Sequence, residues 1–452
     1  MIPPPETTFG PLLTDLYQLN MMQAYLDHGE IKTAVFEFFI RTLPTRRGFL
    51  ISAGLEQVLN FLEQLRFSDD DIAWLSSTGR FGKPLVDYLA GLRFTGDVHA
   101  MAEGTAFFAD EPILRITAPL PQAQLIETRL INILHFQTLV ASKAARMLLA
   151  APGKLMVDFG LRRAHGAEAG LAAARASYIA GFAGTATVLA GKLYDIPTFG
   201  TMAHSFIQAQ QDEMAAFEMF AQSRPESLTL LIDTYDTEAG ARKVVALARR
   251  LAGRGIKIGA VRLDSGDLTA LSKSVRRILD AGGLGEVRIF ASGGLDEDSV
   301  AQMLRDGAPI DGFGMGTSLT TSSDVPSLDC VYKLQEYAGL ARRKQSTGKA
   351  TWPGRKQVWR KLDAKGRICG DVISVESDRQ EGEPLLRLVM QGGRRTAPSP
   401  PLADIRTRST RELARLPGPL RALEPGVAYP VAIGDALRHL AQDVDLRIQE
   451  TA

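Results

Sequence analysis

Two glycine-rich turns in the second half of the chain have the composition of phosphate-binding loops. The segments 291–296 (ASGGLD) and 314–318 (GMGTS) each follow a short apolar run. Glycine lets backbone N–H groups approach a phosphate closely, and the start of a following helix adds a favourable dipole. Glycines also make ordinary strand–helix turns, so either segment alone is a weak signal. Because the two turns come in succession, together they predict a phosphate site.

A third segment, 261–267 (VRLDSGD), places a guanidinium, two carboxylates and a hydroxyl at the end of another apolar run. Arg262 suits bidentate binding of a carboxylate or a phosphate. Asp264 is suited to hold sugar hydroxyls or a Mg²⁺ ion bound to phosphate. The alternative is an internal ion pair that caps the next helix, which explains Asp267 but leaves Arg262 and Asp264 without a task. We therefore expect both to take part in catalysis.

An aromatic ring followed by guanidinium groups marks the segment 158–163 (DFGLRR). A flat ring stacked on Phe159, with its anionic group near Arg162 or Arg163, describes a planar acidic ligand. The alternative is a packed phenylalanine beside two surface arginines, and the segment alone does not decide between them.

One of the six histidines has polar neighbours, in the segment 200–205 (GTMAHS). His204 could serve as a general base, as a partner of phosphate, or as a nucleophile toward a phosphoryl group. A lone histidine is more often structural, but the adjoining Thr201 and Ser205 favour a functional role. Phosphates, a ribose-like polyol and a planar anion together describe a phosphoribosyl donor and an aromatic acid acceptor.

These segments follow apolar runs that alternate with helical stretches, such as 238–252 and 268–279. The runs cover residues 155–158, 228–233, 258–264, 287–292 and 310–316. Repeated strand–helix units of this kind predict a parallel sheet covered on both faces. Polar chemistry at the carboxyl end of each strand is typical of an irregular (β/α) barrel-like domain, and an open doubly wound sheet obeys the same rule.

The regular alternation of apolar runs and helical stretches ends on both sides of this region. Residues 1–150 mix helices and strands, and we expect an α/β-sandwich domain there. Residues 151–335 are expected to form the barrel-like domain, and residues 336–452 a partly β segment that packs back on the N-terminal domain. Within that last segment, residues 341–367 hold ten Lys and Arg against one Asp. We interpret this basic stretch as a solvated face, because its two tryptophans are too few for a nucleic-acid module.

Composition excludes several classes of protein. The 452 residues carry a formal net charge of +1, so no overall field draws the chain to nucleic acid or to a membrane surface. Two cysteines exclude a disulfide scaffold and a cysteine-rich zinc site. No apolar run reaches the ~18 residues that a membrane span needs, and residues 1–6 lack the pattern of a secretory signal. A cytoplasmic location is expected.

At this point the motifs, taken together, match a known family. The chain resembles bacterial nicotinate phosphoribosyltransferases, which are type II phosphoribosyltransferases. The resemblance covers residues ~12 to ~340 and rests on the segments 13–18, 142–143, 159–163, 200–205, 261–266, 314–317 and 331–334. It implies a barrel-like domain plus an α/β sandwich, in a homodimer with the active site at the subunit interface. It also implies the conversion of nicotinate and phosphoribosyl pyrophosphate to nicotinate mononucleotide and pyrophosphate, with Mg²⁺ and with coupled ATP hydrolysis through a phosphohistidine.

The resemblance also assigns roles to individual residues. Tyr17, from the neighbouring subunit, and Phe159 would enclose the pyridine ring, and Thr201 and Arg262 would contact nicotinate. Arg262 has a second candidate role near the diphosphate, where Arg162 is placed as well. His204 would be the phosphorylated histidine, and Asp264 would face ribose or Mg²⁺. The 5′-phosphate would lie on the two glycine-rich turns, at Gly293, Gly294, Gly316 and Thr317.

Three other functions are weighed against this interpretation. Nicotinamide phosphoribosyltransferases carry an aspartate where this chain has Ala186, in the segment 184–187 (GTAT), and an uncharged position suits a carboxylate substrate better. A barrel lyase acting on a sugar phosphate would need a lysine at a strand end, and the runs above offer none. A nucleic-acid binder would have to use residues 341–367.

Overall fold

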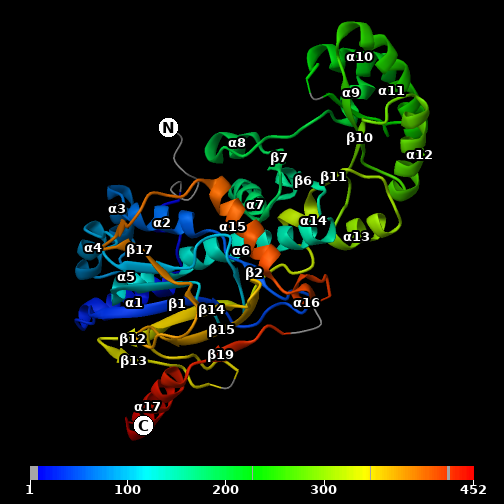
Figure 1. Cartoon of the computed structure of the whole chain (residues 1–452). Coiled ribbons are helices and arrows are strands. Elements are labelled where there is room, and N and C mark those ends of the chain that lie inside the picture. Colours follow the sequence, from blue (N-terminus) through cyan, green and yellow to red (C-terminus); the bar gives the residue numbers. More distant parts are fainter. Residues whose placement is uncertain (1–8, 227, 347, 425–427, 452) are drawn as a thin grey trace. The chain divides into compact units, whose positions relative to one another are not determined.

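The computed structural model describes residues 9–226, 228–346, 348–424 and 428–451, so the expectation about residues 1–6 lies outside the described residues. The chain divides into two compact units (Figure 1). Unit 1 combines Met1–Ser142 with Val325–Ala452, and unit 2 is Lys143–Asp324. Each division falls a little before the corresponding expected boundary, at 150/151 and 335/336.

Unit 2 is built on a six-stranded parallel sheet with the strand order β7-β6-β11-β10-β9-β8. The strands are β6 (Leu155–Asp158), β7 (Gly184–Thr185), β8 (Leu228–Leu231), β9 (Ile258–Leu263), β10 (Arg288–Ala291) and β11 (Gly312–Met315). In a barrel, neighbouring strands follow chain order and the last strand pairs with the first. Here β11 pairs with β6, and the order is interrupted between β7 and β8. The predicted irregular barrel-like fold is confirmed, and the doubly wound alternative is wrong.

Along the chain, the helices of unit 2 alternate with these strands. They are α7 (Ala167–Ala180), α8 (Val188–Tyr194), α9 (His204–Gln208), α10 (Glu213–Ser223), α11 (Thr237–Leu251), α12 (Leu268–Ala281), α13 (Glu297–Arg305) and α14 (Thr317–Thr320), with two short 3-10 helices, Leu161–Arg163 and Ala252–Arg254. Several of these helices are preceded by a capping aspartate. Its carboxylate accepts a hydrogen bond from the backbone N–H three residues later, as that of Asp267 does from Ala270. The helix-cap interpretation of Asp267 is therefore confirmed.

Unit 1 contains a seven-stranded sheet to which both ends of the chain contribute. Its order is β13-β12-β1-β5-β3-β17-β18, with β1 (Thr33–Ile40), β3 (Asp97–Ala100), β5 (Leu114–Pro119), β12 (Cys330–Tyr337), β13 (Leu340–Ala341), β17 (Arg387–Gln391) and β18 (Arg394–Arg395). A four-stranded sheet, β16-β14-β15-β19, comes wholly from the C-terminal part. Its strands are β14 (Lys356–Leu362), β15 (Ile368–Val375), β16 (Glu383–Pro384) and β19 (Val431–Ile433), and β2 (Leu50–Ile51) pairs with β4 (Ala106–Phe107). The α/β domain predicted from the N- and C-terminal segments is confirmed.

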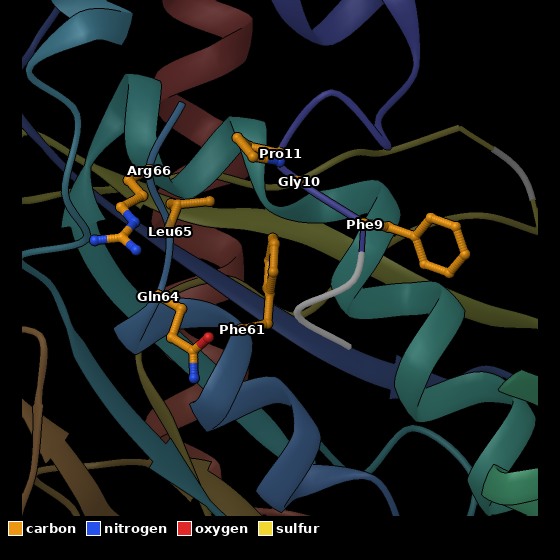
Figure 2. A pocket seen from close by; sticks show the side chains of 7 residues that line it. All are labelled: Phe9, Gly10, Pro11, Phe61, Gln64, Leu65 and Arg66. Carbon is orange, nitrogen blue, oxygen red and sulfur yellow. The ribbon is translucent and has the colours of Figure 1, made fainter. Parts of the chain in front are cut away.

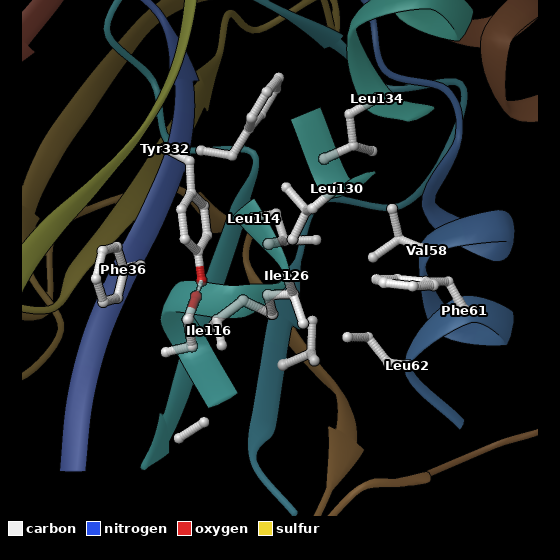
Figure 3. Close-up of a cluster of buried hydrophobic side chains, with 14 of the residues drawn as sticks. Phe36, Val58, Phe61, Leu62, Leu114, Ile116, Ile126, Leu130, Leu134 and Tyr332 are labelled. Atoms are coloured by element: carbon white, nitrogen blue, oxygen red, sulfur yellow. Dashed lines mark hydrogen bonds between the residues drawn. The ribbon is translucent and has the colours of Figure 1, made fainter. Parts of the chain in front are cut away.

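Helices pack on these sheets and enclose the main hydrophobic core of unit 1. They are α1 (Leu16–Asp27), α2 (Leu55–Glu63), α3 (Asp69–Ser77), α4 (Lys83–Ala90), α5 (Leu120–Leu125), the long α6 (Glu127–Ala150), whose last turns belong to unit 2, α15 (Leu402–Arg415), α16 (Gly418–Arg421) and α17 (Asp435–Thr451). Figure 3 shows part of this core, where Tyr332 of β12 stacks on Phe36 of β1 with 4.8 Å between ring centroids. The Tyr332 hydroxyl donates a hydrogen bond to the Ala123 carbonyl, so the C-terminal part is fixed to the N-terminal part in the core.

The prediction of a solvated basic face over residues 341–367 is wrong for Lys356 and Arg360 of β14. The side chains of Lys356 and Arg360 are only 4% and 2% exposed. Lys356 Nζ lies 2.7 Å from a carboxylate oxygen of Glu37, and Arg360 Nη2 lies 2.6 Å from one of Asp371. The partners come from other strands of the fold, so a count of local charges could not reveal them.

No helix in the described part of the chain is both long enough and apolar enough to span a membrane.

Candidate active site

Arg262, on β9, connects three segments of unit 2 at the carboxyl end of the parallel sheet. Its Nε donates to Ser292 Oγ after β10 at 2.8 Å, and its Nη2 lies 2.8 Å from Asp264 Oδ1. Its Nη1 donates to Thr201 Oγ1 at 3.3 Å and to the Met202 carbonyl at 3.4 Å. Only a planar fork of donors can reach partners in so many directions at once. The contact between Arg262 and the segment 200–205 joins two of the predicted motifs.

Phe159 lies beside Arg262 just after β6. The Arg262 guanidinium carbon is 5.5 Å from the centroid of the Phe159 ring. A Cβ atom at Gly314 of β11 would lie 2.5 Å from a carbon of that ring, so glycine is needed there for the ring to fit. The aromatic ring, the guanidinium and the glycine strand therefore depend on one another for their positions.

Asp158 fixes the backbone that carries Phe159. Its carboxylate accepts hydrogen bonds from the Gly160 N–H at 2.8 Å and from Thr185 Oγ1 at 2.6 Å. Burial raises the pKa of the Asp158 carboxyl, and the bonds from Thr185 and Gly160 oppose that rise. Thr185 is the second residue of the segment 184–187, so Asp158 also links Phe159 to the segment that holds Ala186.

His204 begins α9 and faces the same strand ends. Its Nδ1 lies 3.1 Å from Thr234 Oγ1, and its Nε2 lies 3.9 Å from Asp264 Oδ2. The side chain is 39% exposed, so one part of the ring is held by protein while another part stays accessible. This arrangement orients the imidazole and leaves it available to a ligand.

Asp264 is the carboxylate on which these contacts converge. Burial by itself would raise the pKa of the Asp264 carboxyl. The hydrogen bonds from Ser292 and Arg262, together with the positive charge of Arg262, outweigh burial and hold the pKa below its usual value. Asp264 is therefore ionised at neutral pH and can accept hydrogen bonds from a polyol.

Asp233 and Ser292 belong to this site although the sequence analysis did not select them. Asp233 Oδ2 accepts hydrogen bonds from the Asp264 N–H at 2.8 Å and from Ser265 Oγ at 2.6 Å. Its Oδ1 is buried and has no hydrogen-bond partner in the described structure. Both residues end apolar runs that the sequence analysis did identify. The signal was their position at a strand end, since the carboxyl ends of parallel strands meet at one edge of a sheet.

The two glycine-rich turns lie next to each other after β10 and β11. Gly293 has φ +96°, and a Cβ there would lie 2.0 Å from the Asp264 carbonyl oxygen. A residue with a side chain cannot replace it without moving the strand end that carries Asp264. Ser318 Oγ of the second turn donates a hydrogen bond to the Leu295 carbonyl of the first. The turns that hold Gly293, Gly294, Gly316 and Thr317 thus form one connected structure.

Two predicted site residues are not part of these contacts. Arg162 lies on the exposed 3-10 helix Leu161–Arg163, and within the described residues it has no side-chain hydrogen bond to the others. Tyr17 is on α1 of unit 1, and its side chain is 46% exposed. A pocket of about 140 Å³ in unit 1, between the segment 9–11 and the end of α2, is lined by none of the predicted site residues (Figure 2).

Comparison with known proteins assigns the chain to a family. Residues 12–135 match the model of the nicotinate phosphoribosyltransferase N-terminal domain, 155–348 the model of the nicotinate phosphoribosyltransferase family, and 378–441 that of its C-terminal domain. The chain is 49% identical over 445 residues to nicotinate phosphoribosyltransferase pncB2 of Mycobacterium tuberculosis (strain H37Rv), covering 98% of this chain and 95% of that protein. It is 40% identical to the nicotinate phosphoribosyltransferase of Bacillus subtilis, covering 83% of this chain and 78% of that protein.

A solved structure agrees with these sequence matches. The crystal structure of human nicotinic acid phosphoribosyltransferase superimposes with a TM-score of 0.85 at 30% identity, covering 96% of this chain and 100% of that one. The chain belongs to the nicotinate phosphoribosyltransferase family.

Proposed function

We propose that the strand ends around Arg262 carry out the reaction for which the family is named. The chain is a nicotinate phosphoribosyltransferase, an enzyme that salvages nicotinate for NAD synthesis. The ring nitrogen of nicotinate forms a bond to C1 of the ribose in phosphoribosyl pyrophosphate, while the bond from C1 to the pyrophosphate oxygen breaks. The observation that carries this proposal is Arg262, which joins Thr201, Ser292 and Asp264 beside the Phe159 ring.

The residues present divide between the two substrates. Phe159 offers one face for the pyridine ring, and Arg262 with Thr201 offers donors for its carboxylate. Asp264, held ionised, accepts hydrogen bonds from the ribose hydroxyls. The 5′-phosphate fits the joined glycine-rich turns, at Gly293, Gly294, Gly316 and Thr317. Arg162 is proposed to contact the diphosphate, and Arg262 remains a second candidate for that contact.

Catalysis in this site is electrostatic and positional. As the bond to pyrophosphate breaks, the ribose carbon becomes cation-like and negative charge develops on the leaving group. Arg262 and Arg162 would stabilise that charge, while the Phe159 ring and the glycine-rich turns hold the reacting atoms in line. No group has to remove a proton from nicotinate, because the attacking ring nitrogen carries a lone pair.

The carboxylates at the strand ends fit a Mg²⁺ ion carried by the pyrophosphate. Asp233 Oδ1 is buried without a hydrogen-bond partner in the described structure, and Asp264 Oδ2 faces away from the Arg262 pair. Mg²⁺ prefers one or two carboxylates plus the phosphates of a substrate. Asp264 and Asp233 are therefore the residues proposed to hold it. The ion would neutralise charge on the leaving pyrophosphate.

ATP is proposed as a second substrate through His204. The γ-phosphoryl group would pass to a nitrogen of His204 with release of ADP, and water would later take it from the histidine as inorganic phosphate. The Thr234 hydroxyl, 3.1 Å from Nδ1, holds the ring in place for this transfer. A phosphate on His204 would add negative charge and acceptor oxygens beside Asp264, where Mg²⁺ and pyrophosphate bind.

Replacing His204 with alanine should abolish the coupling to ATP. We expect His204→Ala to lose phosphate labelling from γ-labelled ATP and to lose the stimulation of mononucleotide formation by ATP, because the acceptor nitrogen is gone. The exposed His165 of the same unit provides the matched control, since His165→Ala keeps every residue of the site. Full ATP stimulation in His204→Ala would refute the proposed phosphohistidine.

The function itself is tested by offering the enzyme both pyridine substrates. Purified protein is incubated with phosphoribosyl pyrophosphate, Mg²⁺ and either nicotinate or nicotinamide, with and without ATP, and the mononucleotide is followed by mass spectrometry. We expect turnover of the acid and not of the amide, because the segment that holds Ala186 provides no carboxylate to accept from an amide. Turnover of the amide alone would show a nicotinamide enzyme.

A homodimer completes the proposal. Tyr17 would come from a second copy of the chain and enclose the pyridine ring opposite Phe159, and in the single chain Tyr17 is 46% exposed. We place the enzyme in the cytoplasm, where its phosphorylated substrates are made. Both cysteines are free, as a reducing compartment requires.

A further inference from the structure

We propose that Lys143 is a positioning residue that holds both phosphate-binding turns in place through ion pairs with the segments that follow them. The inference rests on the proposed function, because it concerns the turns assigned there to the 5′-phosphate. Lys143 belongs to α6, and the side chain is 2% exposed. A lysine buried to this degree has its charge compensated by partners.

The two partners of Lys143 follow the two turns in the sequence, Glu297 at once and Asp324 after the short helix α14. Its Nζ is 2.5 Å from Glu297 Oε2 and 2.7 Å from Asp324 Oδ1. Glu297 is the first residue of α13, which begins just after the turn 292–296. Asp324 follows α14, which begins just after Gly316. One ammonium group therefore links the segments that follow both turns.

The first of these partners is held from a second side as well. Arg146, one turn further along α6, donates from Nε to Glu297 Oε1 at 3.0 Å. Glu297 is 1% exposed, and its two carboxylate oxygens contact two cationic side chains of α6, Lys143 and Arg146, instead of water. The first turn of α13 is thereby fixed to α6, separately from the hydrogen bond from Ser318 to Leu295 that joins the two turns directly.

Removing Lys143 would leave two carboxylates close together without the cation between them. Repulsion between the two carboxylates, no longer offset by the ammonium group between them, would push Glu297 and Asp324 apart, even though Arg146 still pairs with Glu297. The two turns are attached to these residues, so the distance between the turns would change. Binding of a phosphate that needs N–H groups from both turns is sensitive to displacements of the order of 1 Å.

The test measures substrate binding in Lys143→Met. We expect the KM for phosphoribosyl pyrophosphate to rise about tenfold, since misplaced binding groups cost at least that much, while the KM for nicotinate stays within about twofold of wild type. The affinity for ribose 5-phosphate, measured by calorimetry, should fall by a similar factor. Lys143→Arg keeps the charge and should restore most of the affinity.

Two further variants make the outcome decisive. Lys243→Met removes a lysine 2.8 Å from the buried Glu213 in the same unit, away from the turns, so it should lower stability without changing either KM. Asp324→Asn breaks only one arm, keeps the Glu297 pair, and serves if Lys143→Met does not fold. It should raise the KM for phosphoribosyl pyrophosphate about threefold, by the same loss of positioning.

The result can be separated from the proposed function. If wild-type protein forms no nicotinate mononucleotide, the proposed function is wrong, whereas the calorimetric comparison of ribose 5-phosphate still reports on the turns. If wild type is active and folded Lys143→Met or Asp324→Asn binds phosphoribosyl pyrophosphate as wild type does, the positioning role is refuted. An equal rise of KM for both substrates would likewise show that Lys143 has only a structural role.

Discussion

Replacing Arg262 with leucine should lower kcat/KM for nicotinate mononucleotide formation by about a thousandfold, the size of effect seen when a preorganised charge donor is removed from an active site. Arg262 holds Thr201, Ser292 and Asp264 around one guanidinium. Without it the site loses a positive charge and three segments lose their common partner. Steady-state kinetics with both substrates measure the loss.

The variant Arg262→Lys separates the effect of the positive charge from that of the guanidinium geometry. Arg262→Lys keeps one positive charge at this position but offers a single point of attachment instead of a planar fork. We therefore expect this variant to recover only a small part of the lost activity. If lysine restored wild-type kcat/KM, charge alone would explain the role of Arg262, and the network of contacts would be irrelevant to catalysis.

A matched arginine in the same unit controls for lost stability. Arg276 of α12 donates to the carbonyls of Val287 and Leu284 and pairs with Asp280, and its side chain is 20% exposed against 14% for Arg262. Arg276→Leu removes a comparable set of hydrogen bonds outside the site. We expect it to lower the melting temperature without changing kcat/KM. Wild-type kcat/KM in folded Arg262→Leu would contradict the proposed active site.

Five of the six strands of the unit 2 sheet could be predicted because each lies in a short, largely apolar run, whereas β7 lies in none of these runs. Runs such as 258–264 carry their own signal, since most of their residues are apolar, as in strands that are covered on both faces, and their polar residues come near the carboxyl end. Their carboxyl-terminal polar residues then identify the site edge. The sequence could not show which ends come together, because that depends on strand order. The pairing of β6 with β11 places Phe159 beside Gly314, and it joins two strands that lie far apart in the sequence.

Sequence patterns are least informative about charged residues whose partners lie far away along the chain. The contact of Asp233 with the Asp264 backbone joins two strand ends that no local spacing connects. Lys143 and its partners Glu297 and Asp324 lie even further apart along the chain. In unit 1 the same limit made residues 341–367 look like a solvated face. Burial of a charge is decided by its partner, and the partner is a property of the fold.

Arg360 is the strongest case of such a buried charge, and its removal should destabilise unit 1. Its side chain is 2% exposed and pairs with Asp371 at 2.6 Å and with Glu412 at 3.0 Å. Arg360→Leu would leave Asp371 buried without this cation, and Glu412 with only Arg415, whose Nη1 lies 3.7 Å from Glu412 Oε1. We expect the free energy of unfolding to fall by about 3–5 kcal/mol, the usual cost of breaking a buried ion pair from one side. Urea denaturation followed by circular dichroism measures it.

The pH dependence of this loss has a definite sign. Burial, together with the charge of Asp371, already raises the pKa of Glu111 beside Arg360, and the Arg360 charge opposes that rise. Without Arg360, the buried carboxyls bind protons more tightly in the folded state than in the unfolded chain. Stability then decreases as pH rises through their folded pKa values. The deficit of Arg360→Leu should therefore shrink when the pH is lowered from 8 toward 5.

The neighbouring lysine supplies the control for this experiment. Lys361 Nζ lies 3.5 Å from a carboxylate of Glu381, and the two side chains are 42% and 88% exposed. Exposed pairs of this kind contribute at most about 1 kcal/mol, so Lys361→Leu should change stability little. A second variant that replaces Arg360, Asp371 and Glu412 together with leucine should recover part of the lost stability, because of this buried group only the Glu111 carboxyl then remains. If Arg360→Leu were as stable as Lys361→Leu at pH 8, the buried pairs would contribute nothing, and the role of β14 as an internal strand held by charge would be wrong.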